Sequence, residues 1–502
     1  MKGTHETEVL KGEKLDDLCQ EIKDGVLRAV RDGQPAHEVE KRVWGQLLRI
    51  GRQALGQLFA LLGNGDQGET IELPDGRRCE RLEHEHTRRY VSLFGPFELS
   101  RVVYGSREGQ KIEFVPLDNR LQLPESVFSY VLQDWNQSFC AEQAFGPSAA
   151  VIQKILGLRQ SVDSLEHMNL EMSEQVVEYW QTRPQPAAEE EGAILVTSAD
   201  GKGIVMRRSE EDETARVHRH KGEKASSKRM ATVGAVYTVD RYVRTPEQMV
   251  AMMFRDGPQP AEKRPQPQGK RVWANLPVEL EEETITGMEF TYTWLQQEVQ
   301  RRNPAGTKPL VHLCDGQECL WKARDEYLPK ENAVNILDVL HVSSRVWQAA
   351  HVFHAEGSDE AAAFVRERLL KILQGKSERV VRGLREMGSK RGLTGAKKKT
   401  LRTVCGYLEA NRERMRYDEY LAAGYPIASG VVEGACRHLV KDRMERAGMH
   451  WTPAGAQAML DVRSIYVNGE WENYQAFWIE QETERLYPFR VVVEGRSYAQ
   501  AV

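Results

Sequence analysis

The chain has 502 residues, 40% of them hydrophobic, and a formal net charge of -5 at pH 7. This length suggests about three domains, and the apolar content can form a sizeable core, so a disordered chain is excluded. The overall acidity argues against a generic nucleic-acid binder, although charge for such binding must be judged locally.

Seven scattered cysteines without CxxC spacing argue against a disulfide framework. Cys314 and Cys319, with His312 nearby, have a possible zinc-ligand composition, but buried apolar packing is the more common role, and we expect no zinc. Residues 1–15 are polar and no run of 18 uncharged apolar residues occurs, so we expect a cytoplasmic protein without membrane contact.

Apolar periodicity predicts a mostly helical N-terminal region over residues 1–82, a small β element over 83–122 and helices over 123–182. In the last of these segments, a helix, a turn at Gly157 and a second helix from Ser161 match a helix-turn-helix pattern. A motif that recognises DNA and a helical hairpin that only packs explain this pattern equally well.

Prolines and acids over residues 182–191 indicate a linker in which little packs. Beyond it, strand-like runs followed by alternating strands and helices predict a mixed α/β sheet. We expect this sheet domain over 192–342 and 426–480, with a helical insertion over 343–425 between its two parts and a tail over 481–502.

Two strand-like runs lead to an acidic residue followed by glycine, Asp200-Gly201 and Asp315-Gly316. A glycine after a strand permits a tight turn and leaves room for a large ligand. The pair therefore predicts two carboxylates side by side at one sheet edge, although each pattern alone is usually an ordinary turn.

Glu433 is the third candidate acid. Ser429 is expected to cap a helix that begins near Gly430, which places Glu433 near the first turn with Arg437 and Lys441 on the same face. An acid at a helix start is, however, often present only because the helix dipole favours it.

Asp338 and His341 follow another strand-like run and are three residues apart, so they share a face if a helix starts there. Asp338 as a plain helix cap and His341 as a core histidine are the alternatives.

These motifs together resemble those of DDE transposases of bacterial insertion sequences, most of all the ISKra-type family, and more widely Mutator-like enzymes. The likeness covers about residues 85–480 and rests on the segments Ala199–Gly203, Cys314–Gly316, Asp338–His341 and Gly430–Trp451. Relatives often carry a cysteine-rich, zinc-ribbon-like segment where this chain has none, which removes the reason to expect zinc there.

The resemblance implies an RNase H-like fold, with the first aspartate on the first strand, the second after the fourth strand and the glutamate on a later helix. It implies that Asp200, Asp315 and Glu433 are catalytic and bind two Mg²⁺ or Mn²⁺ ions, with Asp338 and His341 as an auxiliary motif. Two such ions can stabilise the attacking and leaving oxygens of a phosphodiester displacement.

Three basic segments are expected to hold the DNA backbone: 376–402, 207–229 and 437–446. The first contains ten Lys or Arg and two Glu, a local net charge of +8. A solvated helix face is the alternative. The side chains expected to contact double-stranded DNA are Lys202, Lys397, Lys398, Lys399, Arg437, Lys441, Arg443, Arg446 and Trp451.

The sequence thus predicts a nucleoid-associated transposase, assembled as a homo-oligomer on terminal inverted repeats and target DNA, that cleaves and transfers DNA strands with metal ions. A DNA-binding repressor or architectural protein descended from a transposase is one alternative. Another RNase H-fold nuclease, such as a junction resolvase, is the second.

Overall fold

The computed structural model describes residues 14–106, 112–207, 228–256, 263–279, 284–446 and 448–489. Its contacts divide the chain into a first unit, Met1–Gln175 with Trp471–Val502, and a second unit, Val176–Glu470. Most of the basic segment 207–229 lies outside the described residues. Among the helices that are described, none has both the length and the apolar character needed to cross a membrane.

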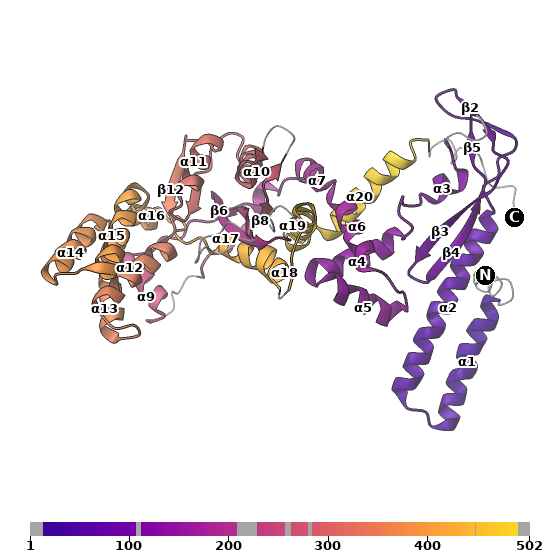
Figure 1. Cartoon of the computed structure of the whole chain (residues 1–502), viewed down its shortest axis with the longest axis horizontal. Helices are drawn as coiled ribbons and strands as arrows, with labels where there is room; N and C mark the ends of the chain where they lie inside the picture. Colours follow the sequence, from indigo (N-terminus) through magenta and orange to yellow (C-terminus); the bar gives the residue numbers. More distant parts are fainter. Residues whose placement is uncertain are drawn as a thin grey trace, which may run out of the picture. The chain divides into compact units, whose positions relative to one another are not determined.

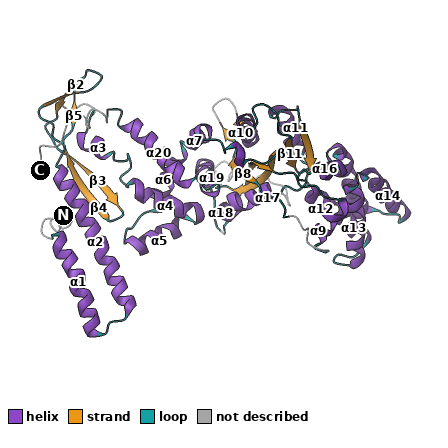
Figure 2. Ribbon diagram, turned by 180° about the vertical axis from the view of Figure 1, so that it is seen from behind, coloured by secondary structure: helices purple, strands orange, loops and turns teal. Residues whose placement is uncertain are grey.

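The first unit begins with a helical hairpin, visible in Figures 1 and 2, of α1 (Leu15–Asp32) and α2 (Ala36–Leu62). Gly33 ends α1 with a φ of 60°, a left-handed conformation that favours glycine. The helices expected in the N-terminal region of residues 1–82 are therefore confirmed over Leu15–Asp32 and Ala36–Leu62.

Two small β elements follow. The hairpin of β3 (His86–Ser92) and β4 (Gly95–Arg101) lies within the small β element predicted over residues 83–122. The sequence did not indicate a second sheet of β1 (Thr70–Glu72), β2 (Arg78–Arg81) and β5 (Tyr104–Gly105). Its core cluster contains the buried side chains of Ile71, Leu73, Cys79, Val102 and Tyr104.

The remaining helices of the first unit are α3 (Pro116–Leu121), α4 (Tyr130–Glu142), α5 (Phe145–Leu156), α6 (Val162–Ser173) and α20 (Trp471–Leu486). Helices α5 and α6 pack on each other and on α4 across the predicted turn at Gly157. The second helix carries Asp163, Glu166 and Glu171 but neither lysine nor arginine, so its charge favours a packing role over contact with phosphates. Because α20 groups with this unit, the segment predicted over 426–480 runs past the end of the second unit.

The second unit is built on a five-stranded mixed sheet, as predicted, with the order β12-β11-β6-β7-β8. Strand β7 is antiparallel to β6 and β8, whereas β6, β11 and β12 run parallel. The strands are β6 (Ile194–Val205), β7 (Lys228–Val239), β8 (Gln268–Asn275), β11 (Leu310–Cys314) and β12 (Ala333–Leu337). Short strands β9 (Val278–Glu279) and β10 (Thr284–Ile285) pair separately.

Helices pack against this sheet: α10 contacts β7 and β8, α19 contacts β8, and α17 contacts β6 and β7. The helices of this unit outside the predicted insertion are α7 (Val176–Thr182), α9 (Pro246–Phe254), α10 (Gly287–Arg302), α11 (Glu318–Tyr327), α17 (Gly430–Ala435), α18 (Asp442–Met444) and α19 (Pro453–Val467). Short 3-10 turns occupy Ala188–Glu190 and Arg412–Arg414, and a π-helical turn, η5 (Cys436–Lys441), joins α17 to α18.

The segment predicted as a helical insertion is helical. It comprises α12 (Val339–Phe353), α13 (Asp359–Leu373), α14 (Ser377–Lys390), α15 (Gly395–Ala410) and α16 (Tyr417–Ala422). Helix α12 packs against α13 and α15, and α14 packs against α15 (Figure 1).

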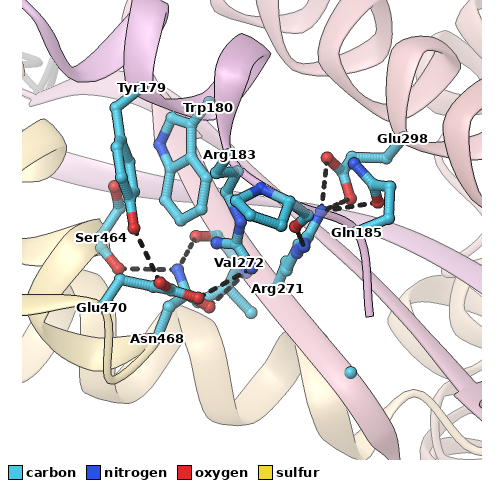
Figure 3. Close-up of polar contacts among 12 residues, drawn as sticks. Tyr179, Trp180, Arg183, Gln185, Arg271, Val272, Glu298, Ser464, Asn468 and Glu470 are labelled. Carbon is cyan, nitrogen blue, oxygen red and sulfur yellow. Dashed lines mark hydrogen bonds and ion pairs between the residues drawn. The ribbon is translucent and has the colours of Figure 1, made fainter. Parts of the chain in front are cut away.

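A buried ion pair fixes the segment that we expected to be a loose linker (Figure 3). Arg271 on β8 donates to both carboxylate oxygens of Glu298 on α10, at 3.0 and 2.8 Å. The same guanidinium donates to the Gln185 side chain and to the Pro184 carbonyl. Arg183 is also buried and pairs with Glu470 at 2.8 Å. The prediction that little packs over residues 182–191 is therefore wrong.

Replacing Arg271 with methionine should destabilise the second unit by about 3–5 kcal/mol, because Glu298 would keep a buried charge without its main partner. Urea unfolding followed by tryptophan fluorescence measures this, since Trp273 lies on the same strand. The control Arg379→Met changes an exposed helical arginine and should shift stability by less than about 0.5 kcal/mol. Equal stability of the two variants would contradict the assigned role of the ion pair.

Candidate active site

The parallel register places Asp315 level with Asp200 on the neighbouring strand. In the ladder between β11 and β6, His312 lies opposite Thr197. The pairs His312–Thr197 and Asp315–Asp200 are separated by the same 115 residues. Extending the register by three residues therefore sets the two aspartates opposite each other, on strands spaced about 4.8 Å apart.

The same row contains a third acid. Strand β12 pairs with β11 so that Leu337 lies opposite Cys314, and the next residues along, Asp338 and Asp315, are level in turn. The Asp338 backbone N–H donates to the Cys314 carbonyl at 2.8 Å, which continues the ladder. Three acidic residues thus lie in one row across three parallel strands.

Asp200 lies in the middle of β6, not at its end. The strand continues to Val205 and pairs with β7 throughout, so Gly201 makes no turn and that prediction is wrong. A Cβ at Gly201 would lie 3.1 Å from the Met230 side chain on β7. The glycine therefore accommodates a cross-strand neighbour.

The Asp200 carboxylate accepts hydrogen bonds from the Gly201 backbone at 2.7 Å and from the Cys436 thiol at 3.4 Å. Burial raises the pKa of Asp200, and the charge of Asp315 raises it further, against these two hydrogen bonds. Cys436 follows Glu433 by three residues, so this contact ties the segment that carries the glutamate to the first aspartate.

Asp315 is held by the start of α11. Its two carboxylate oxygens accept from the backbone and side-chain N–H groups of Gln317, at 2.8 and 2.9 Å. Its carbonyl accepts from the Trp321 indole at 2.8 Å. The loop after β11 therefore has a fixed conformation.

The space beside Gly316 is filled by an aromatic ring and not left for a ligand, contrary to our expectation. A Cβ at Gly316 would lie 2.3 Å from the ring of Tyr407, which comes from α15 of the helical insertion. Burial, together with the charge of Asp315, raises the pKa of Tyr407 to about 12. Arg345 on α12 stacks on that ring, 4.8 Å from its centroid.

Asp338 is completely buried and joins three parts of the site. One oxygen accepts from the backbone N–H groups of Leu340, at 3.1 Å, and Ser429, at 3.2 Å. The other accepts from His341 Nδ1 at 2.6 Å. Burial acts to raise the pKa of Asp338, but the hydrogen bonds from His341 and Leu340 outweigh it and the pKa lies below its usual value.

His341 is half-buried, with 39% of its side chain exposed, so it is not a core histidine. The hydrogen bond to Asp338 raises the pKa of His341 above its usual value although burial opposes this. The charges of Asp315 and Glu433 act in the same direction as Asp338. The imidazole therefore lies in a strongly negative environment.

Glu433 lies in α17 as predicted, but Ser429 does not cap that helix with its side chain. The Ser429 hydroxyl donates to Glu433 Oε1 at 3.3 Å instead. Burial raises the pKa of Glu433, and the charge of Asp338 raises it further. Ser429 thus contacts both acids, through its backbone and through its hydroxyl.

Within the described part of the chain, one group has the geometry of a metal site. Ligand atoms of Asp338, His341 and Glu433 all lie within 4.8 Å of one another. The structure therefore brings Glu433 together with the auxiliary pair. A set formed by Asp200, Asp315 and Glu433 stays a prediction.

The side chains expected to contact DNA divide into exposed and buried groups. Lys397, Lys398 and Lys399 are exposed at the start of α15. Arg443 is fully buried against the ring of Trp451, 5.0 Å from its centroid, and that tryptophan is only 7% exposed. We therefore retain neither Arg443 nor Trp451 as a DNA contact.

Arg437, Lys441 and Arg446 are exposed, whereas Lys202 is partly buried and pairs with Glu445 at 3.4 Å. Arg437 lies 3.9 Å from the Asp442 carboxylate and Arg446 donates to the Asp442 carbonyl at 2.9 Å, so these two side chains, like Lys202, already have partners.

Sequence reasoning did not single out Cys436, Tyr407 and Arg345 as site residues. Cys436 follows Glu433 at helical spacing, so its position on the same face could have been noticed. Tyr407 and Arg345 carry no comparable signal, because they reach Gly316 from helices far along the chain.

No family model matches the chain, and no curated protein matches it either. One solved structure that it resembles is a Drosophila P element transposase strand transfer complex. The TM-score is 0.24 and the sequence identity 9%, over 76% of this chain and 91% of that chain. A similarity of this size does not establish a shared fold.

Replacing Gly316 with alanine should cost about 1–3 kcal/mol of stability, because the new methyl group meets the Tyr407 ring. Thermal unfolding measures the loss. The control Gly406→Ala places a methyl group in open space on the same helix as Tyr407 and should stabilise by up to about 1 kcal/mol. A Gly316→Ala variant as stable as the control would show that the ring does not occupy this position.

Proposed function

We propose that the chain is a DNA transposase, an enzyme that cleaves phosphodiester bonds and joins the released ends to other DNA. The observation that carries the proposal is the row formed by Asp200, Asp315 and Asp338. Glu433 lies beside Asp338, and Cys436, three residues after Glu433, donates a hydrogen bond to Asp200. Acids that come from such distant parts of the chain and lie close together are typical of a site for divalent cations.

The order of the sheet supports an RNase H-like arrangement. In chain order the strands are β6, β7, β8, β11 and β12, and only β7 runs antiparallel to its neighbours. Asp200 lies on the first of these strands and Asp315 directly follows the fourth. Glu433 comes after the helical insertion. These positions agree with those that the resemblance to DDE transposases implies.

The donor chemistry fits divalent metal ions. Carboxylate oxygens are the ligands that Mg²⁺ and Mn²⁺ accept, and burial of like charges beside one another is costly without a cation. Asp200 and Asp315 would hold such ions, and Glu433 would complete the set. When bound, two ions supply charge stabilisation for the oxygens that enter and leave the phosphorus.

The chain's own side chains orient these acids. The Cys436 thiol and the Gly201 backbone fix Asp200, Gln317 fixes Asp315, and the Ser429 hydroxyl contacts Glu433. Because positioning and charge stabilisation account for most of the catalysis in phosphoryl transfer, this fixed geometry is the main contribution of the protein.

The proposed reaction has two displacements. In the first, a water oxygen forms a bond to the scissile phosphorus and the P–O3′ bond breaks, which leaves a 3′-hydroxyl and a 5′-phosphate. In the second, that hydroxyl oxygen forms a bond to a phosphorus of the target DNA while the target's own P–O3′ bond breaks. In each step the nucleophile gives a proton to solvent and the leaving O3′ oxygen takes up a proton from solvent, and the second step conserves the number of phosphodiester bonds.

Asp200→Asn, Asp315→Asn and Glu433→Gln should each reduce metal-dependent cleavage to background. The assay uses the full chain with a DNA duplex that carries the sequence flanking its own reading frame, and Mg²⁺ or Mn²⁺. The control Asp359→Asn neutralises an exposed acid on α13 and should cleave normally. Normal cleavage by any of the first three variants would overturn the proposal, and cleavage without strand joining would indicate a nuclease.

Neutralising Lys397, Lys398 and Lys399 together should flatten the salt dependence of DNA binding. Each lost phosphate contact reduces the magnitude of the slope of log affinity against log salt concentration by about 0.9. The slope of the triple alanine variant should therefore be smaller in magnitude by about 2 to 3. The control Lys322→Ala/Lys330→Ala removes two exposed lysines elsewhere. An unchanged slope in the triple variant would make this part of α15 a solvated face only.

A further inference from the structure

The pair of Asp338 and His341 leaves one imidazole nitrogen uncommitted. The Nδ1 atom of His341 donates to Asp338 at 2.6 Å, so the ring orientation is fixed. In the described residues, the Nε2 atom has no hydrogen-bond partner, and the side chain is 39% exposed. An imidazole that donates one N–H to a carboxylate and presents the other nitrogen is the arrangement common to metal-bound histidines.

Glu433 supplies an oxygen beside this ring. A carboxylate oxygen of Glu433 lies within 4.8 Å of a ring nitrogen of His341 and of an oxygen of Asp338, and the Ser429 hydroxyl donates to Glu433 Oε1 at 3.3 Å. Both oxygens of Asp338 are already occupied by the Leu340, Ser429 and His341 donors. Glu433 and His341 therefore offer free ligand atoms, while Asp338 stands behind the imidazole.

The surrounding charge attracts a cation. Asp338 and Glu433 are close enough for each charge to disfavour the other, and Asp315 and Asp200 lie in the same row. The nearby base Lys202 is paired with Glu445 instead. A divalent ion bound here would offset part of this negative charge.

We infer that His341 Nε2 and Glu433 bind a divalent transition-metal ion of the Mn²⁺ class, with Asp338 as the carboxylate that orients the imidazole. A mixed nitrogen and oxygen set favours such an ion over Mg²⁺, which takes oxygen ligands. This inference deepens the proposed function, on which it rests for the role of Glu433, because it gives one of the two ions a nitrogen ligand.

The chain offers a matched control in the neighbouring pair of His438 and Asp442. There too the histidine Nδ1 atom contacts an aspartate oxygen, at 3.0 Å and four residues away. Both side chains are exposed, and within the described part of the chain this pair belongs to no group with metal-site geometry. An aspartate–histidine pair that is merely structural should behave as this one does.

The test measures binding of Mn²⁺ alone to the full chain without DNA. Titration followed by electron paramagnetic resonance gives the affinity, and pulsed measurements detect coupling between bound Mn²⁺ and an imidazole nitrogen. His341→Gln should weaken binding by at least about tenfold and remove the nitrogen coupling, whereas His438→Gln should change neither. In this variant Asp338 keeps the backbone N–H donors of Leu340 and Ser429.

Two results would overturn the inference: bound Mn²⁺ without nitrogen coupling in the unaltered chain, or an unchanged affinity in His341→Gln. If that variant does not fold, two measurements still test the metal site. These are the nitrogen coupling in the spectrum of the unaltered chain and the Mn²⁺ affinity of Glu433→Gln, which should be weaker. Asp200→Asn separates this inference from the proposed function. Normal cleavage by that variant refutes the proposed function alone, and wild-type Mn²⁺ binding by His341→Gln refutes the metal site alone.

Discussion

The arrangement of the candidate site depends on one buried carboxylate, that of Asp338. A fully buried charge is tolerated only when hydrogen bonds replace the lost water, and here three donors do so. Those donors come from the start of α12, from His341 and from the segment just before Glu433. A single desolvated acid thus determines where strand β12, the helical insertion and the glutamate helix meet.

Much of the architecture follows from local patterns in the sequence. Regularly spaced apolar side chains predicted the helices. Short apolar runs predicted the strands β6, β7, β11 and β12. The two Asp-Gly motifs correctly indicated acids on neighbouring strands, because the parallel register keeps residues 115 apart level with each other. The tight turn expected at Gly201 was nevertheless wrong, and at Gly316 the Tyr407 ring fills the space expected for a ligand.

The features that could not be predicted depend on partners far along the chain. Strand β8 was missed because Arg271 interrupts its apolar run, and the side chain that compensates this charge, Glu298, lies on another element. In the sequence, Arg443 does not differ from the other basic residues of its segment. The fold shows that it is buried against Trp451. Likewise, the contact of Tyr407 with Gly316 joins positions that share no local pattern.

The helical insertion leaves and rejoins the sheet domain at almost the same point. The Val339 N–H donates to the Ile427 carbonyl at 3.0 Å, next to the bond between Asp338 and Ser429. Chain length between two points already joined carries little entropic cost, since each doubling adds only about 0.6 kcal/mol. The helical insertion can therefore lengthen or shorten between these two joined ends while the acids of the candidate site keep their spacing.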